Sequence, residues 1–550
     1  MTALAARRQR PGGPAAGHGP AGLTGTAALI SLALRRDRIV LPVWLYVFAG
    51  SIASTGYSFR HLYTRLPERL ALIASVRSDA SVLALSGPVS GDSAGSLVAW
   101  KVLVFAAGGA GLMGIFTVVR HTRDDEEQGR LELVGATAVG RQAPLAAALV
   151  VAFGSCLVLI PLIAAVQVIL GYPLGGSLAL GAAVGLSGCV FAAIAAVCAQ
   201  LTVSARTARG IAIGMLGVAF LLRAVGDAAS GASWLRWASP LGWAEQMQVY
   251  ASPRWMVGAL FVVAGAVAAG GAGRLAARRD LGAGLLPVRP GRPEAARWLR
   301  SPLALAWRLQ RGALLGWAIG FVLAGAVLGS AASGIGAMLN TSPQARQIFI
   351  RLGGHSGLVD AYLAAVIGML GVASAAYAVA AVLRLHGEET ERWAEPVLAT
   401  PVGRVRWAGS HLLVAAAGSA GLLLAGGLAT ALGDGLTSGS LATQLPRLAG
   451  AGLAQVPAAW VLGGLAAALF GLLPRTAVAG AWTALGLVAL ITLLGPSIRL
   501  AQGAADISPF SHVPKLPGAP VTVAPLAWLG AVAVVLAVAG LAAFRRRDLV

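Results

Sequence analysis

Long apolar segments alternate with short polar segments along the whole chain. Each apolar segment has about 20 residues, which is enough to cross a hydrocarbon core of roughly 30 Å as a helix. Helices are favoured because a backbone inside lipid must satisfy its own hydrogen bonds. We therefore predict twelve spans, six in each half, at residues 39–58, 97–119, 143–170, 177–203, 210–227, 256–274, 313–337, 360–383, 408–432, 448–473, 477–496 and 523–543.

The composition leads to the same fold class. The chain is 57% hydrophobic and 11% charged, which is too apolar for a soluble globular protein. An even number of spans per half gives both halves the same orientation. We predict an all-α polytopic membrane protein with about 12 transmembrane helices in two parallel six-helix halves. Its parts are a disordered cytoplasmic tail (residues 1–26), a first half (residues 27–290) and a second half (residues 291–550).

The net charge of +21 comes almost entirely from arginine, since Lys101 and Lys515 are the only lysines. The arginines are scattered between apolar segments, as expected for basic residues that set membrane topology from the cytoplasmic side. We interpret the charge as a topology signal with lipid as the neighbour, and we predict no nucleic-acid partner. The same rule predicts that both termini are cytoplasmic.

A charged element between the second and third predicted spans occurs again at the same place in the second half. The offset from Glu126 to Glu389 equals the offset from Arg141 to Arg404. The first copy contains Asp125, Glu126, Glu132, Gly140 and Arg141, and the second contains Glu388, Glu389, Glu395, Gly403 and Arg404. We expect each copy to form a short cytoplasmic helix with its acids in the first turns, and each Gly-Arg pair to mark the turn into the next span. We interpret it as a docking element for a partner rather than as a solvated loop.

The duplication extends beyond the charged element. Residues 30–38 and 303–311 share a mixed apolar and basic pattern before the first span of each half. This pattern fits either an amphipathic helix in the membrane interface or a plain topology signal. After the last span of each half, Arg278-Arg279-Asp280 matches Arg546-Arg547-Asp548.

Motifs for chemistry are scarce. Neither lysine lies in a Walker A motif, so any ATP must be bound by another chain. The glycines Gly109, Gly111 and Gly114 fall within a span, where small residues permit close helix packing. Arg223 and Asp227 are spaced to pair on one helix face. We predict no catalytic residues, no metal site and no cofactor.

The two charged elements, the six spans per half and the segment before the first span resemble ABC transporter permeases of the type-2 exporter class. More narrowly, the chain resembles actinobacterial exporters of polyketide antibiotics, which are multidrug efflux permeases linked to antibiotic resistance. The resemblance implies a multi-pass protein of the bacterial plasma membrane. It also implies that the charged elements are coupling helices, each docking one of two copies of an ABC ATPase subunit. Arg392, Trp393 and Pro396 depart from Gly129, Arg130 and Leu133, so the two contacts need not be equal.

The expected function is export of hydrophobic drug- or antibiotic-like molecules, with ATP hydrolysed in the partner subunit. A permease for a lipid or cell-envelope precursor fits the same architecture. An ion-coupled secondary transporter and a non-transporting membrane scaffold are further alternatives. The sequence does not identify the cargo, the substrate-binding residues, the ATPase or the role of the outer segment at residues 60–95.

Overall fold

A computed structural model describes residues 20–78, 80–228, 231–280, 282–286, 294, 296–339, 354–494 and 502–547. The chain divides after Pro290 into two compact units, which are described separately. Most of the predicted tail, residues 1–19, lies outside the described residues, as does Asp548 of the terminal repeat. The described chain begins with the 3-10 turn η1 (Pro20–Leu23).

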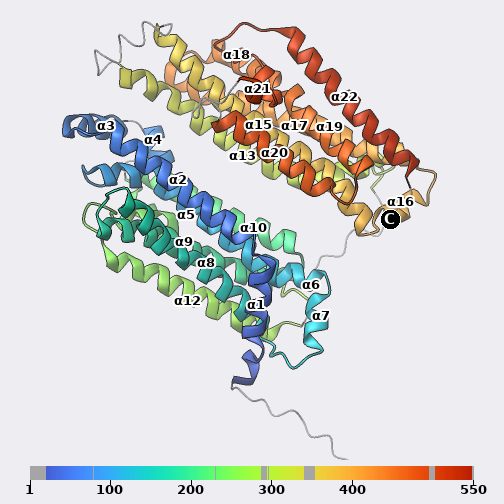
Figure 1. The fold of residues 1–550 in the computed structure, drawn as a ribbon, viewed down its shortest axis with the longest axis horizontal. Helices are drawn as coiled ribbons and strands as arrows, with labels where there is room; N and C mark the ends of the chain where they lie inside the picture. Colours follow the sequence, from blue (N-terminus) through green and yellow to red (C-terminus); the bar gives the residue numbers. More distant parts are fainter. Residues whose placement is uncertain are drawn as a thin grey trace, which may run out of the picture. The chain divides into compact units, whose positions relative to one another are not determined.

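Unit 1 is a bundle of helices around α9 (Figure 1). This helix packs against α5, α8 and α12, and it is rich in glycine and alanine, which let neighbouring backbones approach closely. The elements are α1 (Thr26–Arg36), α2 (Val40–Leu62), α3 (Leu66–Ser78), α4 (Ala80–Ser86), α5 (Ala94–Val119), η2 (Arg120–Asp124), α6 (Asp125–Glu127), α7 (Arg130–Gly135), α8 (Ala143–Ile169), α9 (Leu174–Leu201), α10 (Ala205–Ala228), η3 (Ser233–Ala238), α11 (Pro240–Gln246) and α12 (Trp255–Arg278).

Gly111 and Gly114 of α5 lie against α9, and Gly109 lies against Phe48 of α2, so the predicted role in helix packing is confirmed. A Cβ atom at Gly111 would meet the ring of Phe191 at 2.9 Å, and one at Gly114 would meet the carbonyl oxygen of Gly188 at 2.8 Å. These distances are shorter than van der Waals contact. The Gly109–Gly114 pattern therefore serves helix packing.

Unit 2 repeats this order of long helices. Its fourth span is divided at Gln455, because Pro457 at the start of α19 interrupts the backbone hydrogen bonds. The elements are α13 (Pro302–Leu339), α15 (Gly354–Thr390), α16 (Ala394–Leu398), α17 (Arg404–Ser438), α18 (Leu441–Ala454), α19 (Val456–Leu472), α20 (Ala477–Leu494), α21 (Gln502–Ala505), η4 (Pro509–His512) and α22 (Val523–Arg546).

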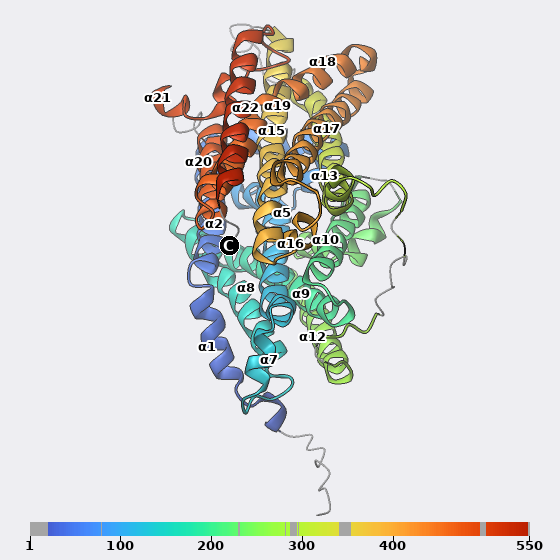
Figure 2. The ribbon, with the colours of Figure 1, turned by 90° about the vertical axis from the view of Figure 1, so that its right-hand side faces the viewer.

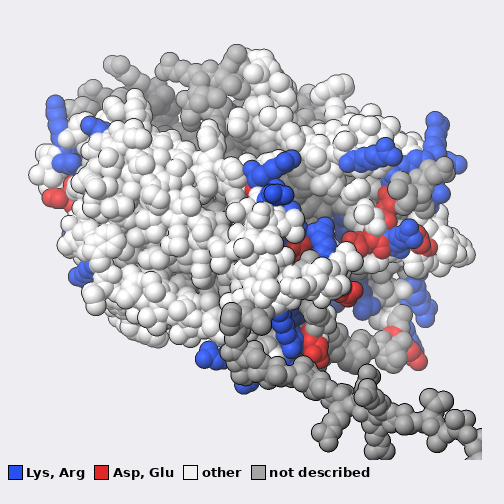
Figure 3. All heavy atoms as spheres, turned by 60° about the horizontal axis from the view of Figure 1, so that its bottom comes forward, with Lys and Arg blue, Asp and Glu red and all other residues white. Residues whose placement is uncertain are grey.

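The predicted fold class is confirmed. Within the described ranges, 11 helices are long and apolar enough to cross a membrane, and the apolar helix Ala477–Leu493 is shorter. The predicted twelve spans therefore correspond to 11 long helices and this shorter one. Many leucine, valine and isoleucine side chains on the helices are exposed, and most of the surface in Figure 3 is uncharged. Such a surface suits contact with lipid.

Each charged element lies at one end of its own unit. In unit 1, α1, α6 and α7 lie at one end and α3 and α4 lie at the other (Figure 1), and the second view again places α1 beside α7 (Figure 2). In unit 2, α16 lies at the end where α22 finishes, and α18 lies at the opposite end. The repeat thus occupies an equivalent end of both units.

Candidate functional site

The first acidic residues of both charged elements lie at the end of a long helix. Helix α5 continues through the π-helical segment η2 into α6, so Asp125 and Glu126 extend the second span. Glu388 and Glu389 lie in the last turn of α15. The expectation that these four residues begin a separate short helix is therefore wrong. The long helix continues because its polar end finds partners within the unit, which hydropathy does not reveal.

The short helices α7 and α16 begin after a left-handed residue. Glu132 and Glu395 lie in their first turns, as predicted. The preceding left-handed residues are Gly129, with φ of 69°, and Arg392, with φ of 58°. Glycine is common at such a helix end, whereas arginine is rare there. The second element keeps this conformation although it has lost the glycine.

The two charged elements also share backbone hydrogen bonds. These bonds close the turn before the short helix and the turn after it. The matching pairs are Gly129 N to Glu126 O and Arg392 N to Glu389 O, both 3.0 Å, and Val139 N to Thr137 O and Val402 N to Thr400 O, both 2.7 Å. The duplication therefore includes the backbone conformation as well as the sequence.

In unit 1, the four consecutive carboxylates from Asp124 to Glu127 bind three other parts of the bundle: α1, α10 and the segment after α12. The contacts are Asp124 with Arg209, Asp125 with Arg36 at 2.7 Å, Glu126 with Arg279 at 2.9 Å, and Glu127 with the backbone nitrogen of Ala205 at 2.7 Å. The side chains of Asp125 and Glu126 are only 11% and 6% exposed. These carboxylates therefore hold helix ends together.

Unit 2 has a smaller version of this network. Glu388 binds Arg384 at 2.8 Å and His411 at 3.5 Å, and Glu389 binds Arg547. Gly387 and Thr390 stand where unit 1 has Asp124 and Glu127. Both glutamate side chains are 7% exposed. The second network thus has two carboxylates where the first has four.

The arginines that close the two elements make equivalent contacts. Arg141 donates from Nη2 to the carbonyl oxygen of Arg279 at 2.5 Å, and Arg404 donates from Nη1 to that of Arg547 at 2.6 Å. Gly403 is the N-cap residue of α17. The backbone nitrogen of Gly140 donates to the carbonyl oxygen of Thr24 at 2.9 Å, just before α8.

The exposed part of the first element lies on α7, and that of the second lies on α16 and its N-cap residue Trp393. Glu132 is exposed and Leu133 is 76% exposed in unit 1. In unit 2, the side chain of Glu395 is 63% exposed and Trp393 is 62% exposed. In Figure 3, acidic and basic side chains lie close together on part of the face shown. Each element therefore combines buried carboxylates with an exposed large apolar residue beside an exposed glutamate.

Asp37 caps the end of α1, binds η2 and is 1% exposed. Its carboxylate lies 2.6 Å from Nε2 of His121 and 2.8 Å from Nη1 of Arg120. Burial alone raises the pKa of Asp37, but the hydrogen bond from His121 and the charges of His121, Arg120 and Arg36 outweigh it and hold this pKa below its ordinary value. In unit 2 the matching residue Gln310 contacts His411 at 3.2 Å.

A second polar cluster lies at the opposite end of unit 1. The predicted pair of Arg223 and Asp227 is confirmed, at 3.3 Å. Arg223 also binds Glu245 at 3.2 Å and donates to the carbonyl oxygen of Ala84 at 2.7 Å, which ties α10 to α4. Burial raises the pKa of Glu245 well above its ordinary value.

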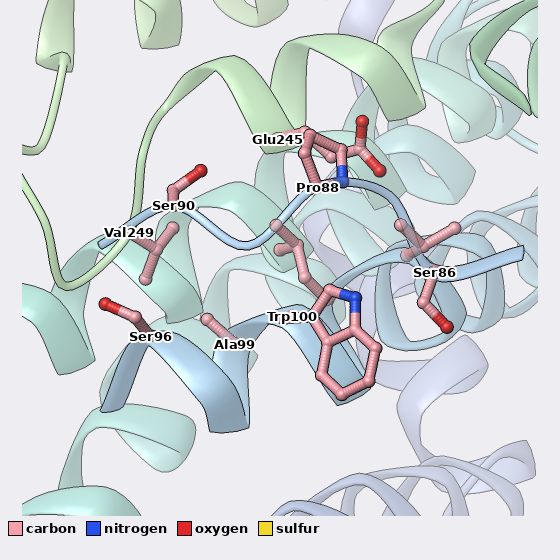
Figure 4. Close-up of a pocket in the computed structure, with 10 residues that line it drawn as sticks. Ser86, Pro88, Ser90, Ser96, Ala99, Trp100, Glu245 and Val249 are labelled. Carbon is pink, nitrogen blue, oxygen red and sulfur yellow. The ribbon is translucent and has the colours of Figure 1, made fainter. Parts of the chain in front are cut away.

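Beside this cluster is a cavity of about 20 Å³ that is lined partly by Glu245 and Trp100 (Figure 4). A cavity of this size holds about one water molecule. Trp100 donates from Nε1 to the carbonyl oxygen of Gly87 at 2.9 Å. The cavity is therefore a packing feature of this end of unit 1 and is too small for a drug-like molecule.

Hydropathy and charge patterns alone assign no partner to Arg279 and Arg547. Both lie in the duplicated Arg-Arg-Asp motif after the last span, and this duplication was the available signal. Their partners Glu126 and Glu389 lie 153 and 158 residues away along the chain. Only the fold brings them together.

These features define a polytopic α-helical membrane protein with a charged element that occurs once in each unit. Residues 299–545 match the family model described as the C-terminal domain of the multidrug efflux system permease Rv1217c. The whole chain is 42% identical over 549 residues to the multidrug efflux system permease protein Rv1217c of Mycobacterium tuberculosis, and the match covers 100% of both chains. The chain belongs to this family of multidrug efflux system permeases.

Proposed function

We propose that this protein is the membrane-spanning subunit of an ATP-driven exporter of hydrophobic, drug-like molecules. The relative from M. tuberculosis is named as a multidrug efflux system permease. The chain carries no Walker A lysine, so a separate ATPase subunit supplies the energy. The basic segments favour a cytoplasmic location for both charged elements and both termini, where ATP is available.

The docking surfaces in this proposal are the exposed faces of α7 and α16. The observation that carries it is the repeated conformation of the two charged elements, each of which exposes a large apolar residue among its described side chains. Leu133 and Trp393 are 76% and 62% exposed, and buried aromatic or aliphatic anchors commonly dominate the affinity of an interface. Glu132 and Glu395 lie beside them and supply charge complementarity.

The buried acids have a different role in the same proposal. Ion pairs within each unit hold the four acids Asp125, Glu126, Glu388 and Glu389. These acids therefore do not contact the ATPase and fix the position of the docking element. Gly140 with Arg141 and Gly403 with Arg404 close it. Two elements on one chain accommodate two copies of the ATPase, and ATP-driven movement of these copies rocks the helices to move cargo outward.

The test is purification of the chain from its native membrane together with the ATPase that accompanies it. We expect the double variant Leu133→Ser/Trp393→Ser to bind the ATPase about 30-fold more weakly, because losing one interface anchor costs about 2 kcal/mol. The matched control is Leu436→Ser/Trp234→Ser, which removes the same residue types at 72% and 66% exposure from the opposite ends of the units. Equal recovery of the ATPase with both double variants would contradict the docking assignment.

A further inference from the structure

One arginine after the last span of each unit holds both ends of a charged element. Its guanidinium binds the glutamate at the start, and its main-chain carbonyl accepts a hydrogen bond from the arginine at the end. In unit 1 this residue is Arg279, between Glu126 and Arg141. In unit 2 it is Arg547, between Glu389 and Arg404. We name this arrangement the arginine clamp.

The clamp of unit 1 is bidentate. Nη1 and Nη2 of Arg279 donate to the two carboxylate oxygens of Glu126 at 3.0 and 2.9 Å. The backbone nitrogen of Gly282 adds a hydrogen bond to Oε1 at 2.6 Å. The side chains of Arg279 and Glu126 are 10% and 6% exposed. Bidentate charged hydrogen bonds shielded from water fix both distance and orientation.

The clamp of unit 2 has the same anchors and a different support. The guanidinium of Arg547 lies over the rings of Phe470 and Phe544, at 4.9 and 5.2 Å from their centroids. These rings belong to α19 and α22. A planar guanidinium suits such stacking better than an ammonium group does. The contact therefore recurs in both units despite different neighbours.

The geometry of the clamp has a mechanical consequence. The exposed helices α7 and α16 lie between two held ends, and the clamp residue follows directly after α12 or α22. A displacement of either short helix therefore reaches the last span of the same unit through a single residue. Discrete polar contacts of this kind carry energetic coupling between sites.

We propose that Arg279 and Arg547 are positioning residues that pass displacement of each charged element to the last helix of its unit. The clamp as a contact stands independently, whereas its role as a relay rests on the proposed function, because a docked ATPase supplies the displacement. The two parts are therefore tested separately.

The first test is hydrogen exchange on the chain alone in lipid nanodiscs. We expect Arg279→Gln to give severalfold faster amide exchange within residues 125–141, and Arg547→Gln to do the same within residues 388–404. The matched controls are Arg278→Gln and Arg546→Gln, which change the neighbouring exposed arginines. Unchanged exchange in the clamp variants would overturn the clamp. Arg279→Lys and Arg547→Lys keep the positive charge but lose the planar guanidinium with its paired donors, so they should give intermediate exchange rates.

The second test measures cargo moved per ATP hydrolysed. The complex with its accompanying ATPase is placed in vesicles with a hydrophobic dye as cargo. We expect the clamp variants to lower this ratio between about 5-fold and 150-fold, the usual range for coupling between two sites. A purely structural role would lower the yield of complex and leave the ratio unchanged, and that result would overturn the relay. If the unaltered chain binds no ATPase, the proposed function and the relay both fail, while hydrogen exchange still decides the clamp.

Discussion

Arg392 adopts a left-handed backbone conformation with φ of 58°, where its counterpart Gly129 has φ of 69°. A side chain at such a position is strained, and the strain persists only where surrounding contacts impose it. Here the backbone nitrogen of Arg392 donates to the carbonyl oxygen of Glu389 at 3.0 Å. The hydrogen-bonded turn therefore imposes a positive φ on Arg392, although arginine alone favours a negative φ.

This strain predicts that Arg392→Gly stabilises the protein. Glycine adopts positive φ without a steric penalty, so we expect a gain of about 1 kcal/mol. The measurement is the thermal midpoint of the purified protein in detergent. The reciprocal change Gly129→Ala should lower the midpoint. A lower midpoint for Arg392→Gly would contradict this prediction. It would show that contacts of the Arg392 side chain stabilise the protein by more than the backbone strain destabilises it.

Glu245 provides a pH dependence at the other end of unit 1. Burial, as the largest cause, raises its pKa well above 4.5, while Arg223 acts in the opposite direction and Asp227 acts with burial. A raised folded-state pKa contributes stability below the unfolded pKa, and this stability is lost as the pH rises through the folded value. We therefore expect the wild type to lose stability relative to Glu245→Gln as the pH rises above 4.5. Parallel curves of thermal midpoint against pH would contradict this account.

The short helices α7 and α16 differ most in what they expose. Trp393 replaces Arg130, and Pro396 replaces Leu133 in a helix that still forms. Behind them, unit 1 has four carboxylates where unit 2 has two. The first element is thus the more firmly held, and the second presents the larger apolar side chain.

This difference predicts unequal docking. Tryptophan is enriched among residues that dominate interfaces, whereas leucine is under-represented. We expect Trp393→Ser alone to weaken ATPase recovery more than Leu133→Ser alone, by about tenfold for a difference of about 1.4 kcal/mol. The single variants are compared by titrating purified ATPase onto the membrane subunit. Equal losses would indicate equivalent docking sites.

Hydropathy correctly predicted the elements whose formation depends only on the polarity and size of their own side chains. The positions of the spans and the packing of Gly111 and Gly114 followed from apolar length and small side chains. The end of α5 did not, because Asp125 and Glu126 stay helical only through partners on α1 and after α12. Exposure of Glu132 and burial of Glu126 likewise depend on tertiary contacts that a one-dimensional pattern does not contain.

At the scale of the whole molecule, the two units repeat one plan with separate cores. In each unit, the charged element, the start of the third long helix and the segment after the last helix meet at one end. In the proposed function, energy that enters there would reach the spans through the carboxylate–arginine contacts at this end. Under the proposed function an ATPase subunit supplies the energy for transport, whereas an ion-coupled transporter would draw it from an ion gradient.

The most direct test is transport by the complex reconstituted in vesicles with a hydrophobic dye as cargo. We expect accumulation that requires ATP and persists when an ionophore collapses the proton and sodium gradients. A variant of the ATPase partner that binds but does not hydrolyse ATP serves as the control. Transport that stops with the ionophore and proceeds without ATP would contradict the central claim.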